Sequence, residues 1–138
     1  MMTLPLANLP RIVCDPAQPP LAERLLIDEA QARELVSLFK VLGNDSRLRL
    51  LHALERAGEL CVTDLAAEVG MTPQAVSNQL QRLVDRRILA ADRRGNNVFY
   101  RIVDPCVTSL LELGLCLNAA RAQEGSAGEW PRLLPPHS

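Results

Sequence analysis

Four cysteines are the residues of this chain best suited to chemistry: Cys14, Cys61, Cys106 and Cys116. A thiolate is a nucleophile and also a ligand for soft metal ions. The four lie far apart in a chain whose other features indicate a cytoplasmic protein, where disulfides are rarely structural. Each cysteine is therefore a buried small hydrophobe, a metal ligand or a redox group.

The sequence offers few other residues or motifs that could carry out catalysis. The chain has two histidines, no G-x-S-x-G or Walker-type loop, and no evident histidine partner for Cys61, so we expect no enzyme. Its 138 residues suffice for one hydrophobic core and leave no room for a second catalytic domain. No uninterrupted apolar run of about 18 residues occurs, and the N-terminus lacks the pattern of a signal peptide. These features predict a soluble cytoplasmic protein without a membrane partner.

The charge of the chain is unevenly distributed. The formal net charge is −1, yet residues 72–101 carry six arginines against two aspartates, a local excess of +4. A basic segment of this kind is typical of a surface that binds nucleic-acid phosphates, although a solvated arginine-rich face is the alternative.

Breaker residues divide the chain into three parts. Prolines indicate an N-terminal arm over residues 1–27, and a flexible tail is predicted for residues 123–138. Between them, residues 28–122 predict about five helices and a β-hairpin of two strands, a mainly α fold. The first helix is predicted from Asp28 to Leu42, and the second follows the cap cluster at residues 44–46 and ends near Ala57.

The next two helices have the pattern of a helix-turn-helix. A short helix from Thr63 to Val69 is followed by Gly70, which tolerates the left-handed turn, and then by Thr72 as an N-cap with Pro73 in the first helical position. The second of these helices pairs an apolar stripe with a polar face of types that contact base edges in a major groove. The predicted DNA-contacting residues here are Thr72, Gln74, Ser77, Asn78 and Gln81. Any helical hairpin with a soluble face is the structural alternative.

The segment that follows favours the DNA-binding interpretation. Residues 88–92 and 98–103 predict two strands joined by a turn of arginine, glycine and asparagine. Such a hairpin is a wing, which can lie along the DNA backbone and reach a minor groove. Its predicted DNA-binding residues are Arg93, Arg94, Asn96 and Asn97. An interaction module with a degenerate winged helix is the less favoured alternative.

Several separated segments resemble the ArsR/SmtB family of winged-helix repressors. They are "LGNDSRLRLL", "ELCVTDLA", "AVSNQL" and "GNNVFYRIVD", in the family's order. The resemblance implies a homodimer formed by the first and last helices, which represses its own operon and leaves double-stranded operator DNA when an inducer binds. Asn78 stands where many relatives carry histidine, so the base preference is not transferred.

The resemblance also suggests a metal site at Cys61. In metal-sensing relatives "ELCVCDL" supplies two thiolates, which cysteines of the partner's N-terminal arm complete. Cys61 matches the first thiolate and Thr63 replaces the second, while Cys14 lies in the arm and could reach a partner's Cys61.

The last helix offers a second arrangement. Cys106 and Cys116 are ten residues apart, about 15 Å along one helix, so they cannot share an ion within one chain. Antiparallel pairing of two such helices, centred near Leu111, would bring the two thiols together across a twofold axis. The resembling family has an Asp-x-His near the start of this helix, and Asp104 and Cys106 match it with thiol in place of imidazole.

Thiolates favour softer ions, so the expected inducer is Hg(II), Cd(II), Pb(II) or As(III), with Zn(II) less favoured. A redox or persulfide switch that joins two thiols is the alternative, and it requires Cα atoms closer than about 7 Å.

Overall fold

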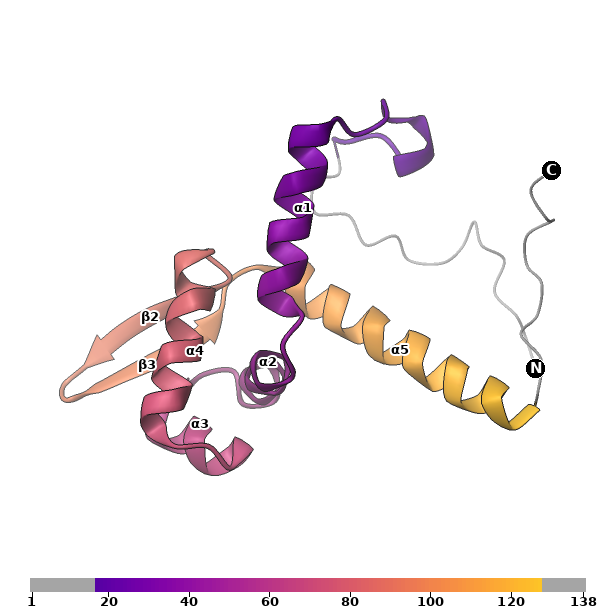
Figure 1. The fold of residues 1–138 in the computed structure, drawn as a ribbon. Coiled ribbons are helices and arrows are strands. Elements are labelled where there is room, and N and C mark those ends of the chain that lie inside the picture. Colours follow the sequence, from indigo (N-terminus) through magenta and orange to yellow (C-terminus); the bar gives the residue numbers. More distant parts are fainter. Residues whose placement is uncertain (1–16, 128–138) are drawn as a thin grey trace.

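The computed structural model describes residues 17–127, which form a winged helix-turn-helix (Figure 1). Helix α4 lies against the hairpin of β2 and β3, while α1 and α5 extend from the core in different directions. The elements of the described segment are η2 Leu21–Glu23, α1 Glu29–Leu42, α2 Asp45–Ala57, β1 Leu60–Cys61, α3 Val62–Val69, α4 Pro73–Asp85, β2 Leu89–Arg94, β3 Asn97–Ile102 and α5 Pro105–Ala127.

Side-chain caps fix the starts of three helices where the sequence predicts them. Asp28 Oδ1 accepts a hydrogen bond from the Gln31 backbone N–H at 2.8 Å and forms a capping box with that residue. Asn44 caps α2, and Thr72 caps α4 with Pro73 directly after it. Helix α3 differs from the prediction, because its N-cap is Cys61, which makes no side-chain capping bond.

The core lies where α2, α3 and α4 meet the sheet. Its fully buried side chains are Leu50, Leu51, Leu54, Leu65, Val76, Leu80, Leu83 and Ile88. Val76, Leu80 and Leu83 belong to the apolar stripe predicted for α4, and Val84 of that stripe is half-buried. Burial of this stripe fixes which face of α4 remains available to a partner.

Helix α1 buries little of its apolar stripe within one chain. Of its apolar stripe only Leu42 is buried, whereas Leu35 is 41% and Phe39 52% exposed. Helix α5 likewise exposes Leu113, Leu115 and Leu117. The first and last helices thus present apolar side chains that the described part of one chain does not cover.

The sheet has three antiparallel strands in the order β1-β3-β2, one more than the predicted hairpin. The added strand, β1, pairs Leu60 with Tyr100 and Cys61 with Phe99. The hairpin turn is also tighter than predicted: Arg93, Arg94 and Asn97 belong to the strands, and Gly95 and Asn96 alone form the turn. Gly95 has φ +65°, which suits the first central position of a two-residue hairpin turn.

The last helix runs to Ala127, so the domain boundary predicted at residue 122 falls inside it. None of the helices in residues 17–127 combines the length and apolar character that a membrane span requires.

We expect Leu80→Ala to lower the free energy of unfolding by about 2 to 5 kcal/mol, because its fully buried side chain would leave a cavity between α4 and the core. Gln81→Ala, at the adjacent exposed position, should change it by less than about 0.5 kcal/mol. Urea unfolding at one protein concentration measures both. Equal losses in the two variants would contradict this description of the core.

Candidate nucleic-acid interface and thiol sites

A left-handed glycine orients the candidate DNA-contacting helix. Gly70 ends α3 with φ +70° and ψ +37°, and the backbone N–H groups of Gly70 and Met71 both donate to the Ala66 carbonyl, at 2.9 and 3.1 Å. This closure turns the chain sharply, so that α4 can begin at Pro73 three residues later. The helix-turn-helix predicted from the sequence is therefore present.

The polar face of α4 is exposed and partly preorganised. Gln74 Nε2 donates to Asn78 Oδ1 at 3.1 Å, and Gln81 Nε2 donates to Asp85 Oδ1 at 2.8 Å. The two residues of each pair lie one helical turn apart, on the side opposite the buried stripe, and Ser77 is half-buried between the two faces. Asn and Gln can each form two hydrogen bonds with adenine, so this face has the chemistry required to contact base edges.

A different side of α4 is tied to α1. Arg47 Nε donates to Gln79 Oε1 at 2.6 Å, and its Nη1 donates to the Val41 carbonyl at 2.8 Å. Near the end of α4, Arg86 Nη1 donates to Ser37 Oγ at 3.0 Å. Arg47, on α2, lies within the "LGNDSRLRLL" segment, and its local pattern gives no sign of these contacts. We refer to these contacts as the α1–α4 ties.

The two wing arginines differ in their surroundings. Arg93 is exposed, and its guanidinium contacts no partner within residues 17–127. Arg94 donates to both carboxylate oxygens of Glu59, at 2.6 and 2.9 Å, and to Asp92 Oδ2 at 3.0 Å. Its guanidinium carbon also lies 4.9 Å from the centre of the Phe99 ring. Both arginines are predicted DNA-binding residues. The guanidinium of Arg93 has no partner within residues 17–127, whereas Arg94, with 49% of its side chain exposed, is bound to two carboxylates.

Hydrogen bonding perturbs the ionisation of this cluster. The bonds from Arg94 are the largest influence on Glu59 and hold the pKa of its carboxyl below the usual value. The same bonds, followed by those with Asp92, raise the pKa of the Arg94 guanidinium. Both groups therefore stay charged at neutral pH, and the other predicted wing residues, Asn96 and Asn97, remain exposed at the tip.

The cysteines occupy three different environments. Cys61 is buried where β1 meets α3 and Cys116 is exposed along α5, and both are free thiols. Cys106 is half-buried in the first turn of α5 and is disulfide-bonded, so it supplies a thiolate only after reduction. Asp104 Oδ1 accepts a hydrogen bond from the Cys106 backbone N–H at 2.9 Å, so this carboxylate caps α5. Cys14 lies outside the described residues. Within residues 17–127 of a single chain, no three His, Cys, Asp or Glu side chains gather closely enough to hold a metal ion.

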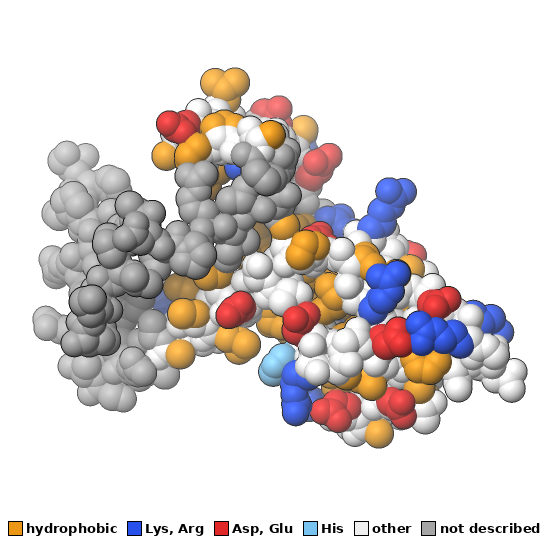
Figure 2. Space-filling model, turned by 180° about the vertical axis from the view of Figure 1, so that it is seen from behind, with side chains coloured by type: hydrophobic (Ala, Val, Ile, Leu, Met, Phe, Trp, Pro, Cys, Tyr) orange, Lys and Arg blue, Asp and Glu red, His pale blue; other side chains and the backbone are white. Residues whose placement is uncertain are grey.

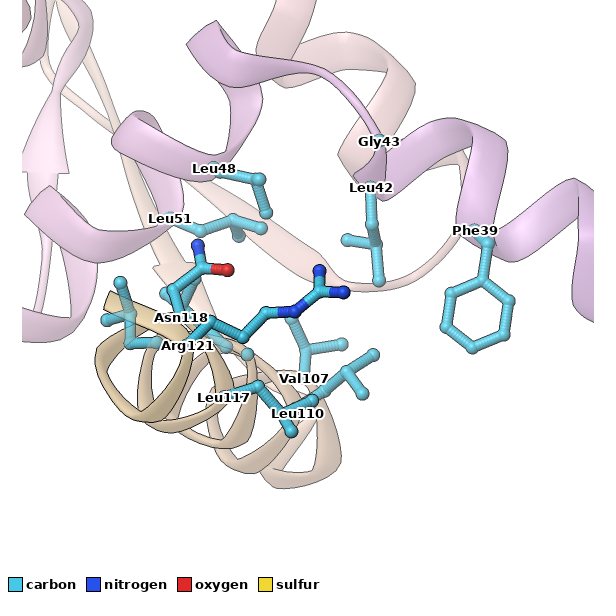
Figure 3. A pocket seen from close by; sticks show the side chains of 13 residues that line it. Phe39, Leu42, Gly43, Leu48, Leu51, Val107, Leu110, Leu117, Asn118 and Arg121 are labelled. Carbon is cyan, nitrogen blue, oxygen red and sulfur yellow. The ribbon is translucent and has the colours of Figure 1, made fainter. Parts of the chain in front are cut away.

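An apolar hollow of about 670 Å³ separates α1 and α2 from α5. Leu42, Leu48 and Leu51 face Leu110 and Leu117 across it (Figure 3). In the space-filling view of Figure 2, hydrophobic side chains gather along α5, beside the more mixed surface of the DNA-binding core. Phe39 of α1 and Leu115 and Leu117 of α5 are thus exposed and line this hollow.

The fold and the exposed helix define a winged helix-turn-helix DNA-binding protein, and known proteins identify its family. Residues 44–90 match the family model "Bacterial regulatory protein, arsR family". The chain is 37% identical over 107 residues to the "Transcriptional repressor SmtB homolog" of Synechocystis, covering 78% of this chain and 79% of that protein. It is 38% identical over 86 residues to the "HTH-type transcriptional regulator NmtR" of Mycobacterium tuberculosis, covering 62% of this chain and 71% of that one.

Solved structures of similar proteins support the same family. The crystal structure of the "AntR antimony-specific transcriptional repressor" is 69% identical with a TM-score of 0.69, covering 78% of this chain and 96% of that one. The homodimeric winged helix-turn-helix domain of a possible ArsR-family regulator from Mycobacterium bovis is 28% identical with a TM-score of 0.58, covering 75% and 94%. The chain belongs to the ArsR family of DNA-binding transcriptional regulators, whose members are not enzymes. The resemblance found in the sequence is confirmed.

We expect Asn78→Ala to weaken binding to an operator, selected from random duplexes by the native protein, by about 1 to 3 kcal/mol, or roughly 5- to 150-fold. Binding to unrelated DNA should stay unchanged, because a base contact is lost and no phosphate contact is. Fluorescence anisotropy with both duplexes measures the two affinities. An equal loss on both would show that Asn78 does not contact bases.

Proposed function

We propose that this protein is a homodimeric transcriptional repressor that leaves its operator when a trivalent metalloid ion, antimony or arsenic, binds cysteine thiolates of helix α5. The observation that carries this proposal is the 69% identity with the antimony-specific repressor across 96% of that chain. The relatives also include an "Arsenical resistance operon repressor" of Bacillus subtilis, 29% identical over 89% of its length.

The homodimer is supported by the apolar surface of α1 and α5. Phe39 and Leu117 expose 52% and 61% of their surface beside the hollow, and a contiguous apolar patch of this kind marks an interface. A second copy of the chain is the occupant we propose, because the relative from Mycobacterium bovis is homodimeric and has the same winged fold. This arrangement keeps the first and last helices as the dimer elements predicted from the sequence.

The dimer would assemble the thiol site from two chains. Cys106 and Cys116 are about 15 Å apart along α5, too far to share an ion within one chain. Antiparallel contact between two α5 helices near Leu111 brings Cys106 of one protomer beside Cys116 of the partner subunit. Twofold symmetry then produces two equivalent sites.

The donor type suits a soft ion. Trivalent arsenic and antimony form strong bonds to thiolate sulfur and take three such donors in a pyramid. The α5 pair supplies two of them. Cys14 is the cysteine we assign as the third, since Cys61 is buried at the edge of the sheet. Asp104 positions Cys106 by capping the helix in this proposal.

Release would follow from linkage between the thiol site and the DNA-binding helices. The dimer contacts lie on α1 and α5, and the α1–α4 ties connect α1 to the DNA-contacting helix. An ion that holds the two α5 helices in a new relative position therefore changes the spacing of the two α4 helices. A coupling of about 1 to 3 kcal/mol corresponds to a loss of operator affinity of roughly 5- to 150-fold.

We expect Sb(III) or As(III) to release operator DNA from the reduced native protein and from Cys61→Ser, and to leave Cys116→Ser bound to it. Anisotropy titrations with Sb(III), As(III), Hg(II), Cd(II), Pb(II) and Zn(II) measure this release. Serine removes the soft donor at either position, so Cys61→Ser is the matched control.

Three outcomes would contradict the proposal. Loss of response in Cys61→Ser with retention in Cys116→Ser would favour the Cys14 and Cys61 arrangement. Release by Hg(II), Cd(II) or Pb(II) alone would exclude a metalloid inducer. Release by a thiol oxidant without release by any ion would support a redox switch.

A further inference from the structure

Arg94 is surrounded by partners on three sides. Its Nη1 and Nη2 form a fork with the Glu59 carboxylate, its Nε donates to Asp92, and its flat face lies over the Phe99 ring. All three guanidinium nitrogens are thus engaged. A forked pair with a carboxylate fixes both the position and the plane of the guanidinium, unlike contact with a single point charge. We call Glu59, Asp92, Arg94 and Phe99 the wing clasp.

The wing clasp joins the wing to the segment before β1, which few backbone hydrogen bonds hold to the sheet. In the sheet order β1-β3-β2, Arg94 on β2 reaches across Phe99 on β3 to Glu59, the residue directly before β1. The pairing of β1 with β3 consists of two residue pairs. Strand β1 runs directly into α3, the first helix of the helix-turn-helix. The clasp therefore adds a side-chain link between the wing and the helices that must contact DNA together with it.

Arg93 provides the contrast within the same strand. Adjacent residues of a strand point to opposite faces, so Arg93 projects away from the clasp. Its guanidinium is exposed, and none of residues 17–127 binds it. Of the two neighbouring wing arginines, one is committed to the protein and the other is available to a phosphate.

We propose that Arg94 is a positioning residue that, with Glu59 and Asp92, fixes the wing relative to the helix-turn-helix, and that Arg93 is the wing's phosphate ligand. This inference rests on the proposed binding of operator DNA. It assigns an acidic residue, Glu59, a role that favours DNA binding, whereas an acidic side chain near DNA ordinarily opposes it through repulsion.

The sign of the Glu59→Gln effect is the main test. We expect Glu59→Gln to weaken operator binding of the full-length dimer by roughly 5- to 30-fold, and Arg94→Gln to weaken it by a similar factor. The double variant should be no weaker than the worse single variant, because one interaction is removed in each case. Glu68→Gln is the matched control: it removes the same charge from another exposed ion pair, with Arg56 at 3.3 Å, and should leave affinity unchanged or slightly higher.

Salt dependence separates positioning from phosphate contact. Arg93→Gln should reduce the slope of log affinity against log salt by about 2, because the dimer loses one phosphate contact at each of its two wings. Arg94→Gln should leave this slope at the native value. Hydroxyl-radical footprinting should show that Glu59→Gln loses the outer protection given by the wing and keeps the protection given by α4, a pattern that general destabilisation would not produce.

Two results would contradict the positioning role of Arg94. One is tighter or unchanged operator binding by Glu59→Gln, and the other is a salt slope reduced by Arg94→Gln as much as by Arg93→Gln. If Glu59→Gln fails to fold by thermal unfolding, Asp92→Asn takes its place with the same expected loss of affinity and of outer protection. A native protein that binds no operator would instead overturn the proposed function, so the two failures are distinguishable.

Discussion

Helices α1 and α5 expose apolar side chains that the described residues of one chain leave uncovered. The winged helix-turn-helix buries its own core without them, since α2, α3, α4 and the sheet supply nearly all of the fully buried side chains. The first and last helices are left with leucines and Phe39 beside an apolar hollow. Our account assigns this surface to a second copy of the chain. Assembly would then place soft donors from two chains beside each other, which one α5 helix cannot do alone.

The same helices would connect the proposed thiol site to DNA. Helix α5 borders the hollow with α1 and α2, and α1 is joined to the DNA-contacting helix by the α1–α4 ties. On the far side of the core, the wing clasp joins the hairpin to the segment before α3. Three of these contacts join residues far apart in sequence: Arg47 with Gln79, Arg86 with Ser37, and Arg94 with Glu59. A change in how two protomers meet can thus reach both DNA-contacting elements without unfolding either.

Local sequence rules predicted the helices and the hairpin well, but they predicted the contacts between elements less well. Capping residues and glycines determine most helix ends through contacts within four residues, so Asp28, Asn44 and Thr72 were identifiable from sequence. Strand β1 was missed because two residues carry no periodicity, and its pairing with β3 is a long-range contact. Periodicity identified the apolar face of α1 but not what covers it, and only the resemblance to a family assigned that face to a dimer. For the same reason the ion pair of Arg94 with Glu59, 35 positions earlier, could not be predicted from the local pattern of the wing.

The most direct test of the central claim is metalloid binding by a mixed dimer of Cys106→Ser and Cys116→Ser chains, co-expressed with two tags and purified through both. Each variant's own homodimer lacks one thiolate in both shared sites. The mixed dimer restores one complete pair, Cys106 from one chain and Cys116 from the other. Our account predicts one Sb(III) bound per mixed dimer, two per native dimer and none per variant homodimer. No binding by the mixed dimer, or undiminished binding by either homodimer, would contradict a site shared across the two α5 helices.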